Sequence, residues 1–232
     1  MVSRQGAIVI FVKTPGYSPL KTRLAQTIGQ AQAEQFHRLS ASAVAAVVQS
    51  VVQQKQVTPY WAVAEEAALE DPLWNQFETI FQGTGDLGTR LAHVNQVLSK
   101  KYDFVIFLGA DTPQLPVAYL TDAIDLLSNV AEQRQFVMGP ADDGGFYLFG
   151  TPICLSQETW LNVPYSAANT SEKLLEQLEG QGDIHQLPSL TDVDTVRELQ
   201  TLIQEESDEK TLLPEQRQVI DWIQQQNFPV SE

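Results

Sequence analysis

The sequence predicts an α/β fold in which helices cover both faces of a mostly parallel sheet, a three-layer α/β/α arrangement. Strand-like and helix-like patterns alternate along the chain, which is typical of such folds. Phe104–Leu108 is an unbroken apolar run followed by Gly109, and it fits a central strand that is covered on both faces. Ala7–Val12 is a second run of this kind, so the sequence predicts at least two buried strands.

The remaining elements follow from periodicity and from breaker residues. Further strands are expected at Thr58–Ala64, Glu78–Gln82, Phe136–Gly139, Phe146–Phe149 and Ile184–Leu187. Helices are expected at Gln30–Gln53, from Gly83–Arg90 to about Ser99, and at Leu115–Leu127, Thr170–Leu178, Thr195–Gln204 and Glu215–Gln226. Lys13–Arg23 is expected to be a loop because it contains two prolines, a glycine and a serine. Asp71–Phe77 is expected to be a short helix or an irregular turn.

Length and composition favour a single domain over residues 1–232, because no linker-like stretch divides the chain. The net charge of −15 argues against a nucleic-acid or anionic-membrane surface. No segment approaches the roughly 20 apolar residues of a membrane span, and a cytoplasmic protein is expected. The lone cysteine, Cys154, is expected to be a buried thiol in a reducing compartment. The oligomeric state is left open.

The N-terminal segment is positively charged, although the chain as a whole is acidic. It has no Asp or Glu before Glu34, yet it carries Lys13, Lys21 and Arg23 in the predicted loop. Phosphate groups are held by cationic side chains and by backbone N–H groups approached closely through a glycine, such as Gly16. The loop therefore predicts an anion site, and the alternative is a set of solvated surface cations.

Asp111 follows the predicted central strand directly. Open α/β sheets bind ligands outside the carboxyl ends of their strands, which places Asp111 in a favourable position. A second carboxylate from a distant segment would complete a Mg²⁺ or Mn²⁺ site, and Asp194 of the TDVDT segment is the candidate. Whether Asp192 or Asp194 is this second ligand stays open. Both segments also allow a simpler role for their acids, as helix N-caps or turn residues.

The ADDGG stretch, Ala141–Gly145, follows another short apolar run. Gly144 and Gly145 allow backbone conformations and close approaches that a side chain would block. Asp142 and Asp143 lie beside this open backbone, suited to binding a hydroxylated acceptor or to acting as a base. The alternative is a tight acidic turn.

Histidine and cysteine patterns predict no further site. No His/Cys cluster has zinc spacing, and no Ser-His-Asp order is visible. His37 is expected on the polar face of the long helix, without a role in chemistry.

Five blocks of the chain resemble a bacterial family known as domain of unknown function 2064, also described as radical-SAM/selenodomain-associated transferases. FVKTPGYSPLKTRLA is similar to the family's F-A-K-x-P-x-x-G-x-x-K-T-R-L, and QGTGDLGTRL to its Q-x-G-x-D-L-G-x-R. FLGADTPQLP resembles I-G-S-D-C-P-x-L, FVMGPADDGGFYLFG resembles L-G-P-A-x-D-G-G-Y-Y-L-I-G, and TDVDTVREL resembles D-I-D-T-x-x-D-L. The chain departs from these patterns in its early Gly16 and in Ala110 and Thr112 around Asp111.

The resemblance implies the GT-A fold of nucleotide-diphospho-sugar transferases. It implies that the first loop cradles the nucleotide phosphates and that Gly83–Arg90 lies near the nucleobase or sugar. Asp111 and Asp194 match the two metal ligands. The nucleotide contacts implied in this way are Lys13, Gly16, Lys21, Arg23, Gly85, Asp86 and Arg90.

Three functions are compatible with these residues. The first is a metal-dependent glycosyltransferase with a nucleotide-sugar donor and a small-molecule acceptor, in which Lys21 stabilises the leaving diphosphate and Asp143 acts as base. The second is a nucleotidyltransferase that joins a nucleoside triphosphate to a phosphorylated small molecule, as guanylyltransferases of this fold do. The third is a nucleotide-binding protein without catalysis.

Overall fold

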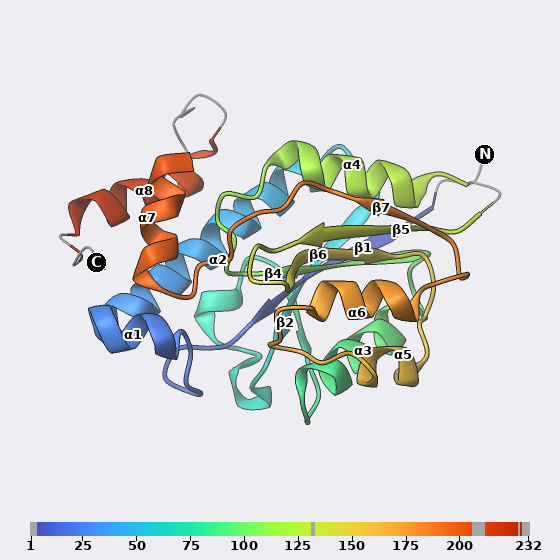
Figure 1. Cartoon of the computed structure of the whole chain (residues 1–232), viewed down its shortest axis with the longest axis horizontal. Coiled ribbons are helices and arrows are strands. Elements are labelled where there is room, and N and C mark those ends of the chain that lie inside the picture. Colours follow the sequence, from blue (N-terminus) through green and yellow to red (C-terminus); the bar gives the residue numbers. More distant parts are fainter. Residues whose placement is uncertain (1–3, 131–132, 206–211, 227, 229–232) are drawn as a thin grey trace.

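The computed structural model describes residues 4–130, 133–205, 212–226 and 228 (Figure 1). Its centre is a seven-stranded sheet with strand order β3-β2-β1-β4-β6-β5-β7. β6 pairs antiparallel with β4 and β5, and the other strand pairs are parallel. The strands are β1 (Gly6–Val12), β2 (Val57–Val63), β3 (Glu78–Phe81), β4 (Phe104–Gly109), β5 (Gln135–Pro140), β6 (Phe146–Thr151) and β7 (Asp183–Gln186).

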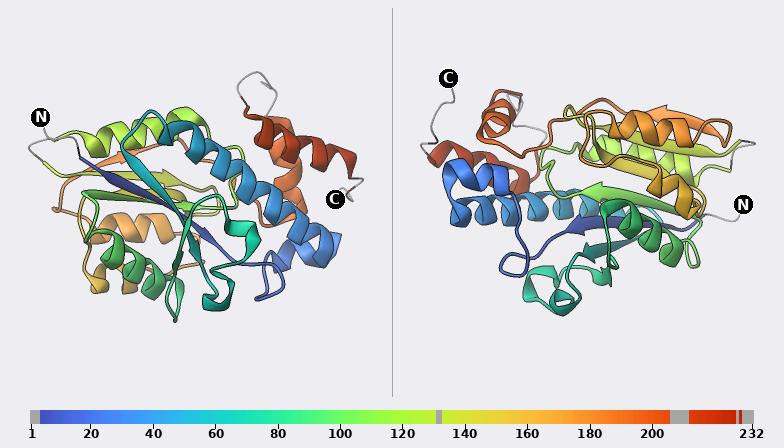
Figure 2. Two further views of the ribbon diagram at one scale, coloured as in Figure 1. Left: turned by 180° about the vertical axis from the view of Figure 1, so that it is seen from behind. Right: turned by 60° about the horizontal axis from the view of Figure 1, so that its bottom comes forward.

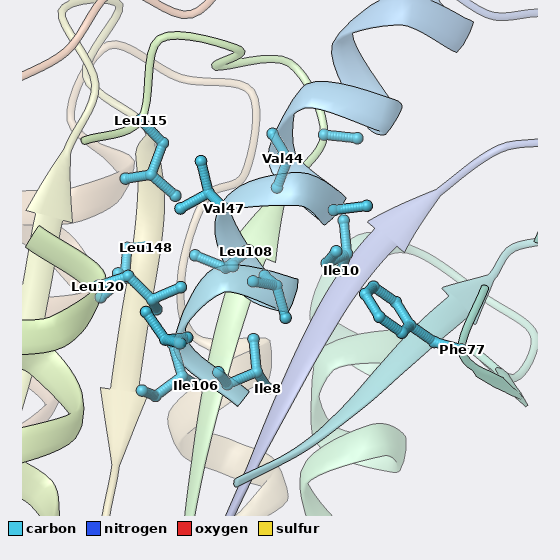
Figure 3. Close-up of a cluster of buried hydrophobic side chains, with 14 of the residues drawn as sticks. Ile8, Ile10, Val44, Val47, Phe77, Ile106, Leu108, Leu115, Leu120 and Leu148 are labelled. Atoms are coloured by element: carbon cyan, nitrogen blue, oxygen red, sulfur yellow. The ribbon is translucent and has the colours of Figure 1, made fainter. Parts of the chain in front are cut away.

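Helices cover both faces of this sheet, as the alternating sequence pattern predicts. On one face, α2 (Gln30–Val52) and α4 (Val117–Ser128) bury a cluster that includes Ile8, Val44 and Leu120 (Figure 3). On the other, α3 (Leu87–Leu98), α5 (Gln157–Leu161) and α6 (Thr170–Gln177) bury a second cluster around Trp160 and Phe107. The three-layer α/β/α prediction is confirmed.

A third apolar cluster lies beyond the end of the sheet. It joins α1 (Thr22–Ile28), α7 (Val196–Glu205) and α8 (Pro214–Gln225) to the first half of α2 (Figure 2). We call these four pieces the helical end group. Leu24, Phe36, Leu199 and Val219 are fully buried within it. Helix α2 therefore contributes to the sheet core with its second half and to the end group with its first.

Several local expectations need correction. The predicted loop ends at Lys21, because α1 already begins at Thr22. This helix has seven residues and one buried side chain, too few to show a periodicity in the sequence. α5, with five residues, was not expected for the same reason. The short helix or turn expected at Asp71–Phe77 is confirmed as the 3-10 helix η2 (Pro72–Trp74), whereas the 3-10 helix η1 (Glu66–Ala68) was not expected.

Cys154 is exposed rather than buried. Its neighbours Ile153 and Leu155 take the inward positions after β6, and Leu155 is 5% exposed. The thiol between them therefore faces outward. No helix in the described part of the chain has the length and hydrophobicity of a membrane span.

The topology brings the ends of β1 and β4 together. The two strands are parallel neighbours, with Phe11 level with Gly109. From β1 the chain proceeds to β2 and β3 on one side, while β4 lies on the other. Loops that leave β1 and β4 diverge at such a point and open a crevice between them.

Candidate functional site

A cavity of about 840 Å³ opens at this crevice. Its walls come from the loop after β1, the ends of β3 and β4, the β5–β6 turn and the segments before α6 and α7. Of the predicted site residues, the lining includes Lys13, Lys21, Arg23, Gly85, Arg90, Asp111, Asp143, Gly145 and Asp194. Gly16, Asp86, Asp142 and Gly144 are not part of it.

Three carboxylates converge on one side of the cavity. One oxygen each of Asp111, Asp192 and Asp194 lies within 4.8 Å of the others. The backbone N–H of Val193 donates to the Asp111 carbonyl at 3.1 Å, which fixes the TDVDT segment against the end of β4. Asp192 and Asp194 thus both reach Asp111.

Neither of these late aspartates is used to cap α7. The Glu198 carboxylate accepts from the backbone N–H groups of Asp194 and Thr195, at 2.7 and 2.5 Å. A carboxylate at this place satisfies N–H groups that would otherwise lack partners at a helix start. The Asp192 and Asp194 side chains are therefore left for the cavity.

Lys21 lies inside the acid cluster, although the sequence predicts it as a phosphate contact. Its Nζ is 2.9 Å from Asp111 Oδ1 and 3.0 Å from Asp194 Oδ1, and it also donates to the Val193 carbonyl. The side chain is 3% exposed. Its backbone has a left-handed conformation, with φ of 46°, at the start of α1.

The charges in this cluster shift one another's pKa values. Burial alone would lower the pKa of Lys21, but the surrounding carboxylates, Asp111 first, outweigh burial and raise it. Burial alone would raise the pKa of Asp111, but the Lys21 charge and His37 hold it well below its usual range. Burial and the nearby Asp111 charge raise the pKa of Asp192 to about 7.

His37 is buried at the site, so its expected place on a polar face is wrong. Its Nε2 is 2.9 Å from the Lys13 carbonyl, and its Nδ1 is 3.8 Å from Asp111 Oδ1. Ser40, one turn later, donates to the Ala110 carbonyl at 2.5 Å. His37 and Ser40 lie at helical spacing from Val44, in the stripe that packs on the sheet, and this alignment could have identified them.

The loop after β1 is anchored from outside the cavity. Glu65 accepts from the Thr14 N–H at 2.9 Å and from the Ser18 hydroxyl. Trp74 Nε1 donates to the Thr14 hydroxyl at 3.0 Å. Gly16 forms the exposed turn of this loop, with φ of 88°, and stands away from the cavity. The anchored backbone holds Lys13 at the cavity wall.

Lys13 of this loop and Arg23 in the first turn of α1 are the more accessible cations. Lys13 is exposed, and its Nζ donates to the Pro19 carbonyl at 3.3 Å. The Arg23 side chain is 72% exposed, with NH1 3.9 Å from Asp194 Oδ2. Both cations can therefore meet an anion that enters the cavity.

The glycine-rich segment before α3 contributes Gly85 to the lining, and the first turn of α3 contributes Arg90. Arg90 Nε donates to the Gly85 carbonyl at 2.9 Å, and NH1 donates to Gln82 Oε1 at 3.3 Å. Gln82, which was not predicted as a site residue, is buried and donates to the Val12 and Ala62 carbonyls. Asp86 caps α3 by accepting from the Thr89 hydroxyl and N–H, and these bonds lower its pKa.

The two aspartates of the ADDGG stretch have different surroundings. Asp143 lines the cavity, and its Oδ1 accepts from the Gly145 N–H at 2.8 Å. The carboxylate of Asp142 instead accepts from the Ser189 and Thr191 hydroxyls, the latter at 3.0 Å. Asp142 thereby ties the turn to the strand-like segment that leads to Asp192.

Gly144 allows a close approach between two segments. A Cβ at this position would lie 2.0 Å from the Ala168 carbonyl oxygen, and φ is +90°. The Ser171 N–H donates to the Gly144 carbonyl at 2.9 Å. This contact sets the segment with Tyr165 and Ser166 beside the turn. These two lining residues were not predicted from the sequence.

The acid cluster fits a hard divalent cation. Asp111 Oδ1 is buried and, among the described residues, receives no well-oriented hydrogen bond; its contacts are the Lys21 ammonium at 2.9 Å and His37 Nδ1 at 3.8 Å. Carboxylate oxygens are the ligands that Mg²⁺ and Mn²⁺ prefer. Asp111, Asp192 and Asp194 are the residues that could hold such an ion.

The architecture is that of the nucleotide-diphospho-sugar transferases, the GT-A fold. A candidate nucleotide-diphospho-sugar transferase from Desulfovibrio desulfuricans G20 has a TM-score of 0.75 to this structure, with 24% identity, covering 94% of this chain and 97% of that chain. A cytidylyltransferase from Leptospira borgpetersenii serovar Hardjo-bovis has a TM-score of 0.54 and 14% identity over 99% and 100% of the two chains. Glucosyl-3-phosphoglycerate synthase from Mycobacterium tuberculosis, in complex with Mn²⁺, uridine diphosphate and phosphoglyceric acid, has a TM-score of 0.52 and 12% identity over 98% and 80%.

Residues 43–167, more than half of the 232-residue chain, match the family described as uncharacterized protein conserved in bacteria, DUF2064. The chain therefore belongs to this family, as the resemblance of its sequence blocks predicts. The match includes the QGTGDLGTRL, FLGADTPQLP and ADDGG blocks. No curated protein matches the chain.

Proposed function

We propose that the protein is a metal-dependent transferase that binds a nucleotide-diphospho-sugar and passes the sugar to a hydroxyl group of a small molecule. The observation that carries this proposal is the acid cluster, because three carboxylates lie beside the basic loop in one cavity. Mg²⁺ and Mn²⁺ in proteins are bound by a few carboxylates together with substrate phosphates. The cluster and the loop would together provide that environment.

The donor half of the site would be the loop after β1 together with the first turn of α1. Lys13 and Arg23 are exposed cations at the cavity wall and would bind the diphosphate. Lys21 would add a third positive charge where negative charge develops on the leaving diphosphate. A bound Mg²⁺ or Mn²⁺ would supply further charge neutralisation as a Lewis acid.

The acceptor half would be the β5–β6 turn. One oxygen of Asp143 is engaged by the Gly145 N–H, and the carboxylate is exposed at the cavity wall. The other oxygen would accept the proton of the attacking hydroxyl, provided that this hydroxyl comes within hydrogen-bond reach. Asp143 is accordingly our candidate general base.

Solved relatives of the fold support a transferase. The synthase from Mycobacterium tuberculosis binds Mn²⁺, uridine diphosphate and phosphoglyceric acid. The protein from Desulfovibrio desulfuricans covers nearly this whole chain. These likenesses motivate nucleotide sugars as the first ligands to test.

Nucleotidyl transfer is the second candidate. The structure of the cytidylyltransferase from Leptospira borgpetersenii is similar over 99% of this chain and 100% of its own. In this reaction the basic loop would bind a triphosphate, and pyrophosphate would leave. Release of pyrophosphate distinguishes this reaction from sugar transfer, which produces none.

A thermal-shift screen tests the proposal. Nucleoside diphosphates, nucleoside triphosphates and nucleotide sugars are each added with and without Mn²⁺, because a ligand that binds only the native state raises the melting temperature. We expect stabilisation by a nucleotide sugar that requires Mn²⁺. Shifts with triphosphates alone would favour nucleotidyl transfer, and no shift with any nucleotide would contradict both reactions.

Asp111 and Asp143 have different expected roles, and substitutions separate them. With the donor found by the screen, Asp111→Asn should lower turnover about 100-fold or more and remove the Mn²⁺-dependent part of the thermal shift. Asp143→Asn should lower turnover while leaving that shift in place. Full turnover in Asp143→Asn would exclude it as the base.

A further inference from the structure

The ammonium of Lys21 occupies the place where a metal ion would bind. Its Nζ is 2.9 Å from Asp111 Oδ1 and 3.0 Å from Asp194 Oδ1, the carboxylates that would bind the ion. A divalent ion bonded to these oxygens and an ammonium bonded to the same oxygens compete for the same negative charge. Metal binding therefore has to displace or weaken an existing ion pair.

We propose that the Lys21 ammonium neutralises the acid cluster in the free protein. A metal ion replaces it at the carboxylates only when a diphosphate also binds. In this scheme, metal and diphosphate bind with positive coupling, and Lys21 is the residue through which they are coupled. The inference rests on the proposed function for the identity of the diphosphate ligand. The exchange of cations itself follows from the contacts of Lys21.

Burial makes the exchange conditional. The Lys21 side chain is 3% exposed, so an ammonium that loses its carboxylates cannot simply turn to water. Loss of both carboxylate partners weakens binding of the metal alone, because the desolvated ammonium keeps only the Val193 carbonyl as a partner. A phosphate oxygen arriving beside the metal would give the ammonium a new partner and remove most of this cost.

The loop geometry is compatible with such a movement. Lys21 is the residue before α1, and the anchors of the loop to Glu65 and Trp74 act at Thr14 and Ser18, several residues away. The Lys21 side chain itself is held by the Asp111 and Asp194 carboxylates and the Val193 carbonyl. Exchange of the partners of Nζ therefore leaves the anchored part of the loop in place.

The metal affinity of the free protein tests the proposal without any nucleotide. Mn²⁺ dissociation constants are measured by electron paramagnetic resonance for the wild type, Lys21→Met and Lys13→Met. Lys13→Met is the matched control, because it removes the same charge from the same loop but from an exposed side chain. We expect Lys21→Met to bind Mn²⁺ about 10-fold or more tightly than the wild type, and Lys13→Met to stay within about 3-fold.

Mn²⁺ affinity in the presence of pyrophosphate is the second measurement. Added to the wild type, pyrophosphate should tighten Mn²⁺ binding, and this tightening should be much smaller in Lys21→Met than in the wild type. Unchanged or weaker Mn²⁺ binding in Lys21→Met would overturn the proposal. So would equal effects of the two substitutions, because they would mean a general effect of charge.

A spectroscopic measurement on the wild type covers the case in which Lys21→Met does not fold. A buried, ion-paired ammonium exchanges slowly with water and gives a resolved ¹H–¹⁵N signal. Saturation with Mg²⁺ and pyrophosphate should shift or remove that signal, and a signal that stays unchanged would refute the exchange. None of these measurements uses a nucleotide, so failure of the nucleotide screen and failure of this proposal are separate results.

Discussion

At the scale of single residues, the site is a balance of buried charges. Three carboxylates lie around one ammonium, and burial together with the negative charge of Asp111 raises the pKa of Asp192. Asp111, which contacts Lys21 directly, has a lowered pKa. Two acids of the same cluster are thus shifted in opposite directions, as happens when one of them is paired and the other is crowded.

The raised pKa of Asp192 predicts how stability depends on pH in the metal-free protein. Its pKa is about 7 in the folded state and about 3.9 in an unfolded chain. The folded state therefore binds the proton more tightly, and the stabilisation is complete below about pH 4 and lost as pH rises through about 7. Asp192→Asn keeps the side chain neutral and should remove this loss.

Thermal melts in a chelator check this expectation. At pH 8, Asp192→Asn should melt roughly 8–16 °C above the wild type, and the difference should shrink toward zero near pH 4. Asp122→Asn, on the exposed face of α4, is the control and should change little at either pH. A difference that grows toward low pH would contradict the assignment.

At the scale of elements, the β5–β6 turn is positioned by a close backbone contact. Gly144 has φ of +90°, and a Cβ there would lie 2.0 Å from the Ala168 carbonyl oxygen. Gly144→Ala should therefore cost both left-handed strain, about 1–2 kcal/mol, and the displacement of the neighbouring segment.

Gly180→Ala separates these two contributions. Gly180 has φ of +75°, and nothing lies within 4 Å of the position that an added methyl group would occupy, so its substitution costs strain alone. Urea denaturation should show a loss of about 1–2 kcal/mol for Gly180→Ala and at least about 1 kcal/mol more for Gly144→Ala. Equal losses of stability in the two variants would mean that the segment at Ala168 moves away from an added methyl group at little cost.

At the scale of the whole molecule, we propose that the chain is one domain. Helix α2 packs Val44 and Val47 into the sheet core and Phe36 and Leu39 into the helical end group. A single rigid helix shared by two cores couples their unfolding. Calorimetry should therefore show a single transition for the chain without ligands.

Matched core substitutions sharpen this test. Leu199, in the end group, and Leu174, in the cluster that α3, α5 and α6 bury against the sheet, are both fully buried. Each change to Ala should cost about 2–5 kcal/mol and lower the same single transition. A separate low-temperature transition in Leu199→Ala would show that the end group unfolds by itself.

Much of the fold could be predicted because its signals are local. Phe104–Leu108 and Ala7–Val12 carry enough apolar residues to identify central strands, and the long α2 shows its periodicity over many turns. Helices α1 and α5 could not be predicted, since five to seven residues do not establish a period. Their positions depend on tertiary packing.

The candidate site was partly predictable for a related reason. Strand ends pointed to Asp111, and charge asymmetry pointed to Lys21, but the direct contact between them depends on the path of the loop. His37 and Gln82 are buried polar residues whose partners come from distant segments, and sequence spacing contains no record of these partners. Asp142, placed beside Asp143 by sequence, forms its bonds with Ser189 and Thr191 instead.

The exposed cysteine offers a labelling position on the native chain. β6 runs antiparallel to β4, and Thr151 at the end of β6 is level with Val105 near the start of β4. Cys154 therefore lies at the end of the sheet opposite the cavity. It is the only cysteine in the sequence. A maleimide dye would therefore label the native chain at one position, away from the ligands, and would need no engineered attachment point.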